Sequence, residues 1–145
     1  MAALFQFENY IDQLIRELEA FPSDESIWLV PPGINNSPGN IGLHIAGNLQ
    51  HFVGSILGKT GYVRHRDEEF TTKGLSKAAV IDQLKTAKVV VNNVLSKLSN
   101  EDRLKPYPEL FKGKELCIDD ALSHLLAHLA YHTGQVNYMR RMVHQ

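Results

Sequence analysis

The residues of this chain best able to do chemistry are its histidines, of which there are seven. His128 and His132 lie four residues apart, and His44 lies in an earlier apolar segment. Positions i and i+4 of a helix share one face, one turn apart, so both imidazoles can point at one site. With a third imidazole from a neighbouring helix, they can hold a divalent metal ion and leave one coordination position open. The spacing therefore predicts a metal site at His44, His128 and His132.

Two more histidines lie near this set along the expected helices. His124 comes one turn before His128, and His51 follows His44 by seven residues. Histidine titrates near neutral pH, so either residue is a candidate proton acceptor. The interpretation we favour places both at a helix boundary or behind the metal ligands. The catalytic residues therefore stay undetermined, with His124 and His51 as weak candidates.

Other side chains bear on whether the site is open. Asn48 and Gln135 are candidates to accept a hydrogen bond from the ring nitrogen that faces away from the metal. No carboxylate of the first or third expected helix lies clearly on an apolar stripe, and no Glu-x-x-His motif of a di-iron bundle is present. The single cysteine, Cys117, precedes His128 by 11 residues, about 16 Å along a helix, and is expected to pack as a small hydrophobe. The fourth ligand should then be water or a small molecule.

Four amphipathic segments must position these residues. Apolar residues recur at helical spacing in each, and no strand pattern is present. Ser37 and Pro38 are typical of a helix start, and Gly58 and Gly61 of a helix end. The expected helices span about 3–20, 38–57, 77–98 and 119 to nearly the C-terminus. This pattern predicts an all-α protein, a four-helix bundle whose long connections leave room for crossovers, in one domain over residues 1–145.

The connecting segments are expected to be loops. The charged stretch with Arg64, Arg66, Asp67 and Glu69 invites a substrate role, but we favour a solvated loop tied to the bundle by ion pairs. His65 and His144 should be peripheral. Glycines inside helices cost about 1 kcal/mol against alanine, so Gly47, Gly54 and Gly134 are expected to have packing reasons.

Composition excludes several function classes. The formal net charge is −1, which argues against non-specific binding of nucleic acid or an anionic membrane. No apolar run approaches the roughly 18 residues needed to span a bilayer, and the first residues do not resemble a signal peptide. One cysteine allows no internal disulfide. These features predict a cytoplasmic protein without membrane or nucleic-acid partners.

Two stretches carry a family resemblance. NSPGNIGLHIAGNLQHF resembles the second helix, and HLLAHLAYHTGQVNYMRR the fourth helix, of the DinB-like (YfiT-like) four-helix-bundle superfamily. VRHRDEEF resembles an Arg-Asp-x-Glu-Phe segment of one branch. Thr133 departs from the pattern, because arginine is common at that position.

The resemblance implies a function that spacing does not. It implies a metal-dependent enzyme with a divalent ion, zinc or nickel, held by His44, His128 and His132. It also implies a transferase that uses a low-molecular-weight thiol on an electrophile, and a homodimer. The alternatives are a metal-binding protein without turnover and a purely structural helical bundle. Three imidazoles do not by themselves select among divalent metals.

Overall fold

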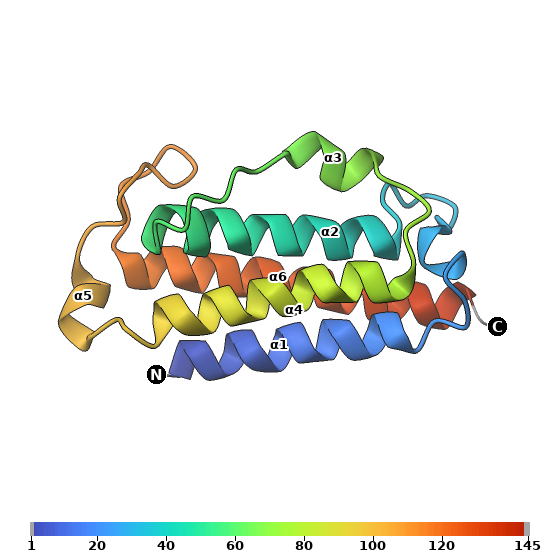
Figure 1. Cartoon of the computed structure of the whole chain (residues 1–145), viewed down its shortest axis with the longest axis horizontal. Helices are drawn as coiled ribbons and strands as arrows, with labels where there is room; N and C mark the ends of the chain where they lie inside the picture. The colour runs from blue at the N-terminus through green and yellow to red at the C-terminus, as the bar shows by residue number, and fades with distance from the viewer. Residues whose placement is uncertain (1, 144–145) are drawn as a thin grey trace.

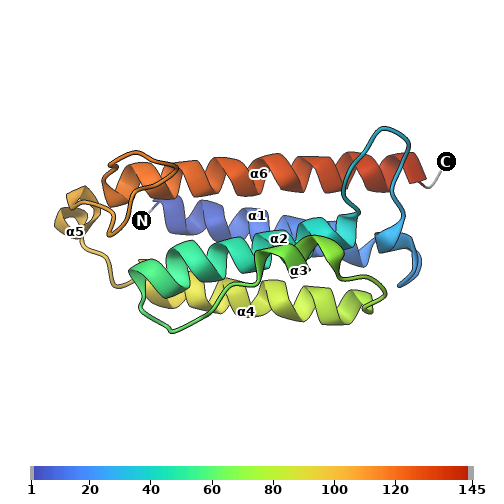
Figure 2. The same ribbon diagram turned by 90° about the horizontal axis from the view of Figure 1, so that it is seen from above.

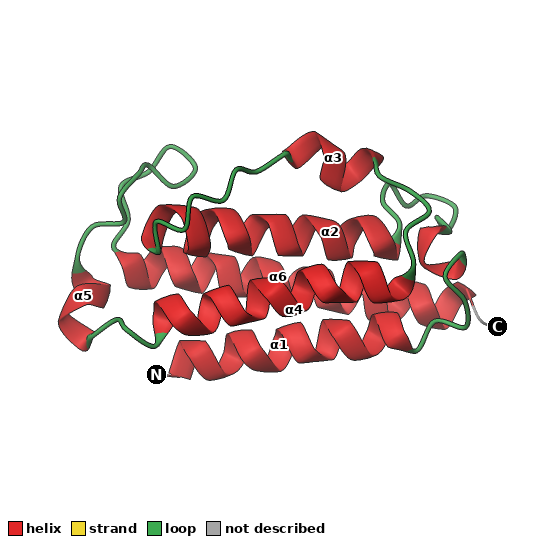
Figure 3. Ribbon diagram, viewed as in Figure 1, coloured by secondary structure: helices red, strands yellow, loops and turns green. Residues whose placement is uncertain are grey.

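In the computed structural model, which describes residues 2–143, the chain is all-α, with four long helices lying side by side (Figures 1 and 3). The long helices are α1 (Ala2–Glu19), α2 (Pro38–Leu49) with its continuation η2 (Gln50–Leu57), α4 (Lys77–Leu95) and α6 (Ile118–Val143). The short helices are η1 (Ser26–Trp28), α3 (Arg66–Thr71) and α5 (Asn100–Leu104). No strand occurs within residues 2–143, only two isolated β-bridges.

The order of the long helices is not a simple up-and-down meander. α1 and α6 run in one direction, and α2 and α4 run in the opposite one (Figures 1 and 2). α1 packs against α4 and α6, and α2 packs against the same two helices, so α1 and α2 are diagonal. The connection between α2 and α4 runs back along the length of these helices, whereas the connection between α4 and α6 stays at one end of them (Figures 1 and 2). α2 and α6 are therefore antiparallel neighbours, which brings His44 close to His128 and His132.

Helix starts follow the capping chemistry of the sequence. The Ser37 hydroxyl accepts a hydrogen bond from the Asn40 backbone N–H at 3.2 Å, and Pro38 occupies the first turn of α2, as expected. Ser76 caps α4 in the same way through the Ala79 N–H. α4 ends at Leu95, three residues before the expected end, where the backbone tightens into turns.

The second long helix changes its winding half-way. From Gln50 to Leu57 the backbone is π-helical, and the Gly58 N–H bonds to the Val53 carbonyl five residues earlier. A projection at 100° per residue assumes α-helical winding throughout, so it misplaces side chains in this segment. His51, which follows His44 by seven residues, lies in this π-helical segment.

Both segments expected to be plain loops contain structure. The charged stretch forms α3, which lies on the outside of α2 (Figure 1). The longer connection forms α5 and then a hairpin-like turn, in which Tyr107 pairs with Leu116, and Phe111 with Lys114. α3 and α5 are six and five residues long, too short to show helical periodicity.

The core is apolar and continuous along the helices. α1 and α4 bury only hydrophobic side chains, whereas α2 also buries Asn40, His44 and Asn48. Gly54 lies against Val90, as a packing role predicts, but nothing lies within 4 Å of a Cβ built on Gly134, so the packing prediction for Gly134 was wrong. No helix among the described residues is long and apolar enough to cross a bilayer.

Candidate metal centre

The three predicted histidines meet between α2 and α6. The Nε2 atom of His128 lies 3.1 Å from Nε2 of His44 and 3.1 Å from Nε2 of His132. The three rings offer nitrogen atoms that all lie within 4.8 Å of one another. His44 is buried, and the other two are half-buried. Within the described part of the chain, this is the one group of three metal-ligating side chains so close together.

A buried carboxylate orients His44. Nδ1 of His44 lies 3.0 Å from Oε1 of Glu69, and because a carboxylate only accepts, Nδ1 carries the proton. Nε2 then keeps its lone pair toward the other rings. Arg64 donates through Nε and Nη2 to both oxygens of Glu69, at 2.8 Å each. Burial alone would raise the pKa of Glu69, but the hydrogen bonds from His44 and Arg64 outweigh it and hold that pKa below its usual range.

The sequence interpretation placed Glu69 in a solvated loop, whereas the structure buries it beside His44. The stretch around it was expected to be solvated, and Arg66, Asp67 and Glu68 are indeed exposed. Glu69 itself is only 7% exposed, and Arg64 is mostly covered. The ion pair expected in this segment is present, but it lies against the histidines instead of in solvent.

Two residues of α2 make room for Glu69 and hold it. A Cβ built on Gly47 would overlap the Glu69 carboxylate, so glycine is required there by the site. Asn40, fully buried, donates through Nδ2 to the backbone carbonyls of Glu69 at 2.9 Å and Thr72 at 2.8 Å. These bonds fix α3 on α2. The glycine inside a helix was the one sequence signal that pointed to this arrangement.

His132 is oriented as predicted, whereas Asn48 does not take the predicted role. Nδ1 of His132 lies 2.7 Å from Oε1 of Gln135, which leaves Nε2 as the acceptor atom. Asn48 is buried, but its Oδ1 has no partner among the described residues, and neither does Nδ1 of His128. Thr133 is buried and donates to the Leu129 carbonyl within its own helix.

The surroundings keep the two α6 histidines neutral. Burial lowers the pKa of His128 to about 3, with further contributions from His132, His44, Lys112 and Arg64. Burial also lowers the pKa of His132, although the Gln135 contact opposes this in part. Neutral imidazole is the form that binds metal ions. The environment therefore maintains the ligand form of these rings at neutral pH.

A cavity of about 210 Å³ opens beside His44 and His128. Its wall includes Asn48, Phe52 and His124. His124 is exposed, lies within α6 and packs edge-on at 5.1 Å against the Phe111 ring. His51 does not line this cavity; it packs against Phe52, and burial and Arg64 lower its pKa.

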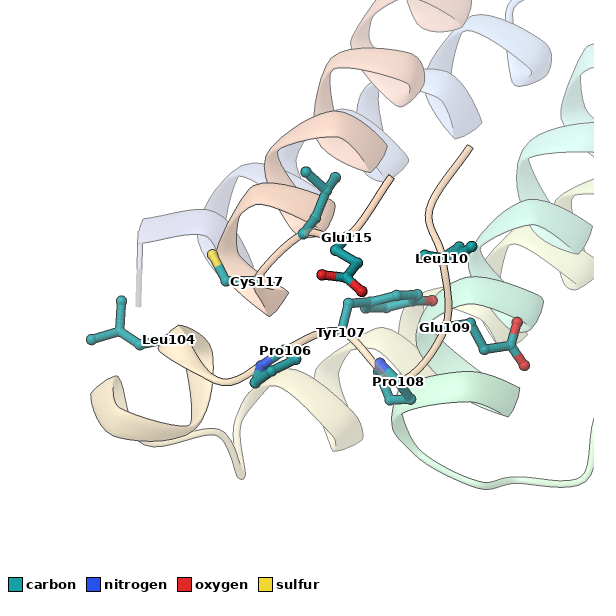
Figure 4. Close-up of a pocket in the computed structure, with 9 residues that line it drawn as sticks. Leu104, Pro106, Tyr107, Pro108, Glu109, Leu110, Glu115 and Cys117 are labelled. Carbon is teal, nitrogen blue, oxygen red and sulfur yellow. The ribbon is translucent and has the colours of Figure 1, made fainter. Parts of the chain in front are cut away.

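Cys117 belongs to a different part of the molecule. It lies immediately before α6, half-buried, and lines a separate cavity of about 490 Å³ beside Pro106 and Tyr107 (Figure 4). It does not belong to the histidine group. The prediction that Cys117 is no ligand of that site agrees with this placement.

Fold and site together define an all-α protein with a three-histidine group that can hold a metal ion. A family model described as protein of unknown function (DUF1572) matches residues 2–145, and the chain belongs to this family. No curated protein matches the chain.

Proposed function

We propose that this protein is a metal-dependent enzyme in which His44, His128 and His132 hold a divalent ion, zinc or nickel. The observation that carries the proposal is the meeting of three Nε2 atoms beside a cavity whose wall includes His44 and His128. Nδ1 of His44 is held by Glu69, and Nδ1 of His132 by Gln135. In this arrangement the lone pairs of His44 and His132 converge on His128.

The residues fit a metal ion better than they fit one another. The single Nε2–H of His128 can donate a good hydrogen bond to His44 or to His132, but not to both. The Nε2 lone pair of the remaining histidine then has no proton to accept. Nitrogens bound at 2.0–2.1 Å to a tetrahedral zinc ion lie about 3.3 Å apart. The two Nε2–Nε2 separations of 3.1 Å are close to that spacing.

The open side of the site supports chemistry on a small molecule. A divalent ion held by His44, His128 and His132 would lower the pKa of a bound thiol or water and so supply a nucleophile at neutral pH. Glu69, paired with Arg64, orients His44 and supplies negative charge behind it. His124 is the further histidine at the cavity and can take up a proton there. We propose a thiol transferase, with a low-molecular-weight thiol and an electrophile as substrates.

We further propose that the chain is a single four-helix-bundle domain of the DinB-like type, cytoplasmic and homodimeric. The support is the sequence resemblance in the second and last long helices, together with the crossed helix order. The competing proposals are a metal-binding protein without turnover and a structural bundle. Metal content and thiol reactivity separate the three.

The test is elemental analysis of purified, metal-loaded protein. We expect about one ion per chain in the wild type and an affinity at least about 100-fold lower for His128→Ala, because apparent binding energies of about 10–16 kcal/mol are shared among four ligands. His65→Ala is the matched control, since His65 is exposed and does not line the cavity beside His44. A wild type that binds no metal after loading overturns the proposal. Metal binding with no reaction between any thiol and electrophile favours the non-catalytic alternative.

A further inference from the structure

The cavity beside the histidines is lined by cations and by no carboxylate. Arg64, Arg66 and Lys112 contribute to its wall together with His124. Among the described residues, no aspartate or glutamate is part of the wall, although the chain has 16 acidic residues. The single carboxylate of the site, Glu69, lies on the far side of His44. A cavity lined by one sign of charge concentrates ligands of the other sign.

Two of the three cations are free to pair with a ligand. Glu69 already binds Arg64 through both oxygens. Within residues 2–143, neither Arg66 nor Lys112 has a carboxylate oxygen within 4.0 Å. Arg66 lies over the Phe70 ring, with its guanidinium carbon 5.2 Å from the ring centroid. That contact restrains Arg66 without neutralising it.

The turn that carries Lys112 is fixed in place over the cavity. Phe111, buried, packs its ring 5.2 Å from Phe52 and 5.1 Å from His124. The Tyr107 hydroxyl donates to the Phe52 carbonyl at 2.7 Å, which ties the same segment to η2. Lys112 has φ of 50° and Gly113 of 78°, the left-handed pair of a type I′ turn. Asparagine is the preferred residue at such a position, so lysine here is an unfavourable choice for the backbone.

We propose that the cavity binds a small anionic ligand of the carboxylate class. Lys112 and Arg66 hold its charged group, and a second donor atom of the ligand takes the open position beside the three histidines. The volume of about 210 Å³ is below the roughly 300–1,000 Å³ of sites for drug-sized ligands, so the ligand is small. In terms of the proposed function, on which this inference rests, the thiol substrate carries a carboxylate.

The test compares two thiols of similar size on the cobalt-loaded full chain. One is 3-mercaptopropionate, which carries a carboxylate, and the other is 2-mercaptoethanol, which is neutral. Binding is followed by the sulfur-to-cobalt absorption band at low ionic strength. We expect Lys112→Asn to weaken 3-mercaptopropionate binding about 2- to 5-fold, the size typical of an exposed ion pair, with 2-mercaptoethanol binding unchanged. Lys112→Asn/Arg66→Gln should weaken it further, and 0.5 M salt should reduce the difference between variants.

The chain offers a matched control in Lys59. It is also a lysine with a left-handed backbone, φ 51°, and it is exposed outside the cavity. Asparagine suits the backbone at both positions, so neither Lys112→Asn nor Lys59→Asn should lower the unfolding temperature. Lys59→Asn should bind both thiols as the wild type does.

The outcomes separate the two proposals. A protein that takes up no cobalt overturns the proposed function and this inference with it. If the protein takes up cobalt, but Lys112→Asn leaves the binding of both thiols unchanged or weakens the binding of both equally, this inference alone is overturned.

Discussion

The interface between α1 and α4 and the interface between α2 and α6 have similar helical frames but opposite chemistry. Every buried residue of α1 and α4 is apolar. α2 buries Asn40, His44 and Asn48 and faces the two half-buried histidines of α6. Buried polar groups stabilise a fold little beyond the cost of removing them from water. The α1–α4 interface therefore stabilises the fold. The α2–α6 interface contributes less stability, because it holds polar side chains in place.

The largest expected effect comes from the apolar core to which α4 contributes. Leu84 of α4 is fully buried, and Leu84→Ala should lower the free energy of unfolding by about 2–5 kcal/mol through lost contacts and a cavity. Val89→Ala on the same helix is the control, since Val89 is 58% exposed and its change should stay within about 0.5 kcal/mol. Denaturant unfolding measures both. Metal content of folded Leu84→Ala should match the wild type; a folded variant without metal would show that the two interfaces are not separable.

A smaller effect should come from the carboxylate behind His44. Glu69→Gln removes the charge that accepts from His44 and Arg64, and we expect metal affinity to fall about 10- to 100-fold, as for other groups that orient metal-bound histidines. Competition with a chromophoric chelator measures the affinity. Glu68→Gln changes the exposed neighbour of Glu69 on the same short helix and should leave the metal affinity unchanged. Equal metal affinities of Glu69→Gln and Glu68→Gln would show that Glu69 does not contribute to the metal site.

The smallest effect is the acid sensitivity of the metal-free protein. The pKa of His128 is lowered from 6.5 to about 3, so between those pH values the unfolded chain binds a proton that the native one does not. Stability from this residue is complete above pH 6.5 and decreases as pH falls, by up to about 1.4 kcal/mol per pH unit. His132 acts in the same direction.

Unfolding between pH 5 and 6.5 reports mainly on histidines, because the carboxylates Glu17 and Glu69, whose pKa values are lowered, titrate at lower pH. His132 and His51, whose pKa values are also lowered, add to the same slope. His128→Asn should flatten the pH dependence of the free energy of unfolding, whereas His65→Asn, at an exposed position, should not. The same slope in His128→Asn as in the wild type would contradict the assignment.

Much of the helical frame and the histidine group could be predicted from local sequence signals. Periodicity and the Ser37 cap act within a few residues, and so does the spacing of His128 and His132. The burial of Glu69 beside His44 could not be predicted from such local signals. Its partner His44 lies 25 residues earlier, in a contact that only the crossover of the chain creates. A run of charged residues is usually solvated, so the sequence pattern favoured an exposed position for Glu69 and not the buried one that it has.

Two further features lie beyond pattern reasoning for different reasons. The second long helix becomes π-helical after Leu49, which a projection at α-helical spacing does not include, and His51 does not line the cavity. Lys112 was not singled out, because a lysine in a loop is ordinary in sequence terms. Its left-handed backbone is visible only in the folded turn.

The position of two ligand histidines on α6 has a consequence for synthesis. A chain is made from its N-terminus, and segments emerge and begin to fold in that order. His44, Arg64 and Glu69 are all synthesised before α5, but His128 and His132 are synthesised only with α6. A nascent chain that ends before α6 therefore cannot assemble the three-histidine group, so the proposed metal site is complete only after that helix has been translated.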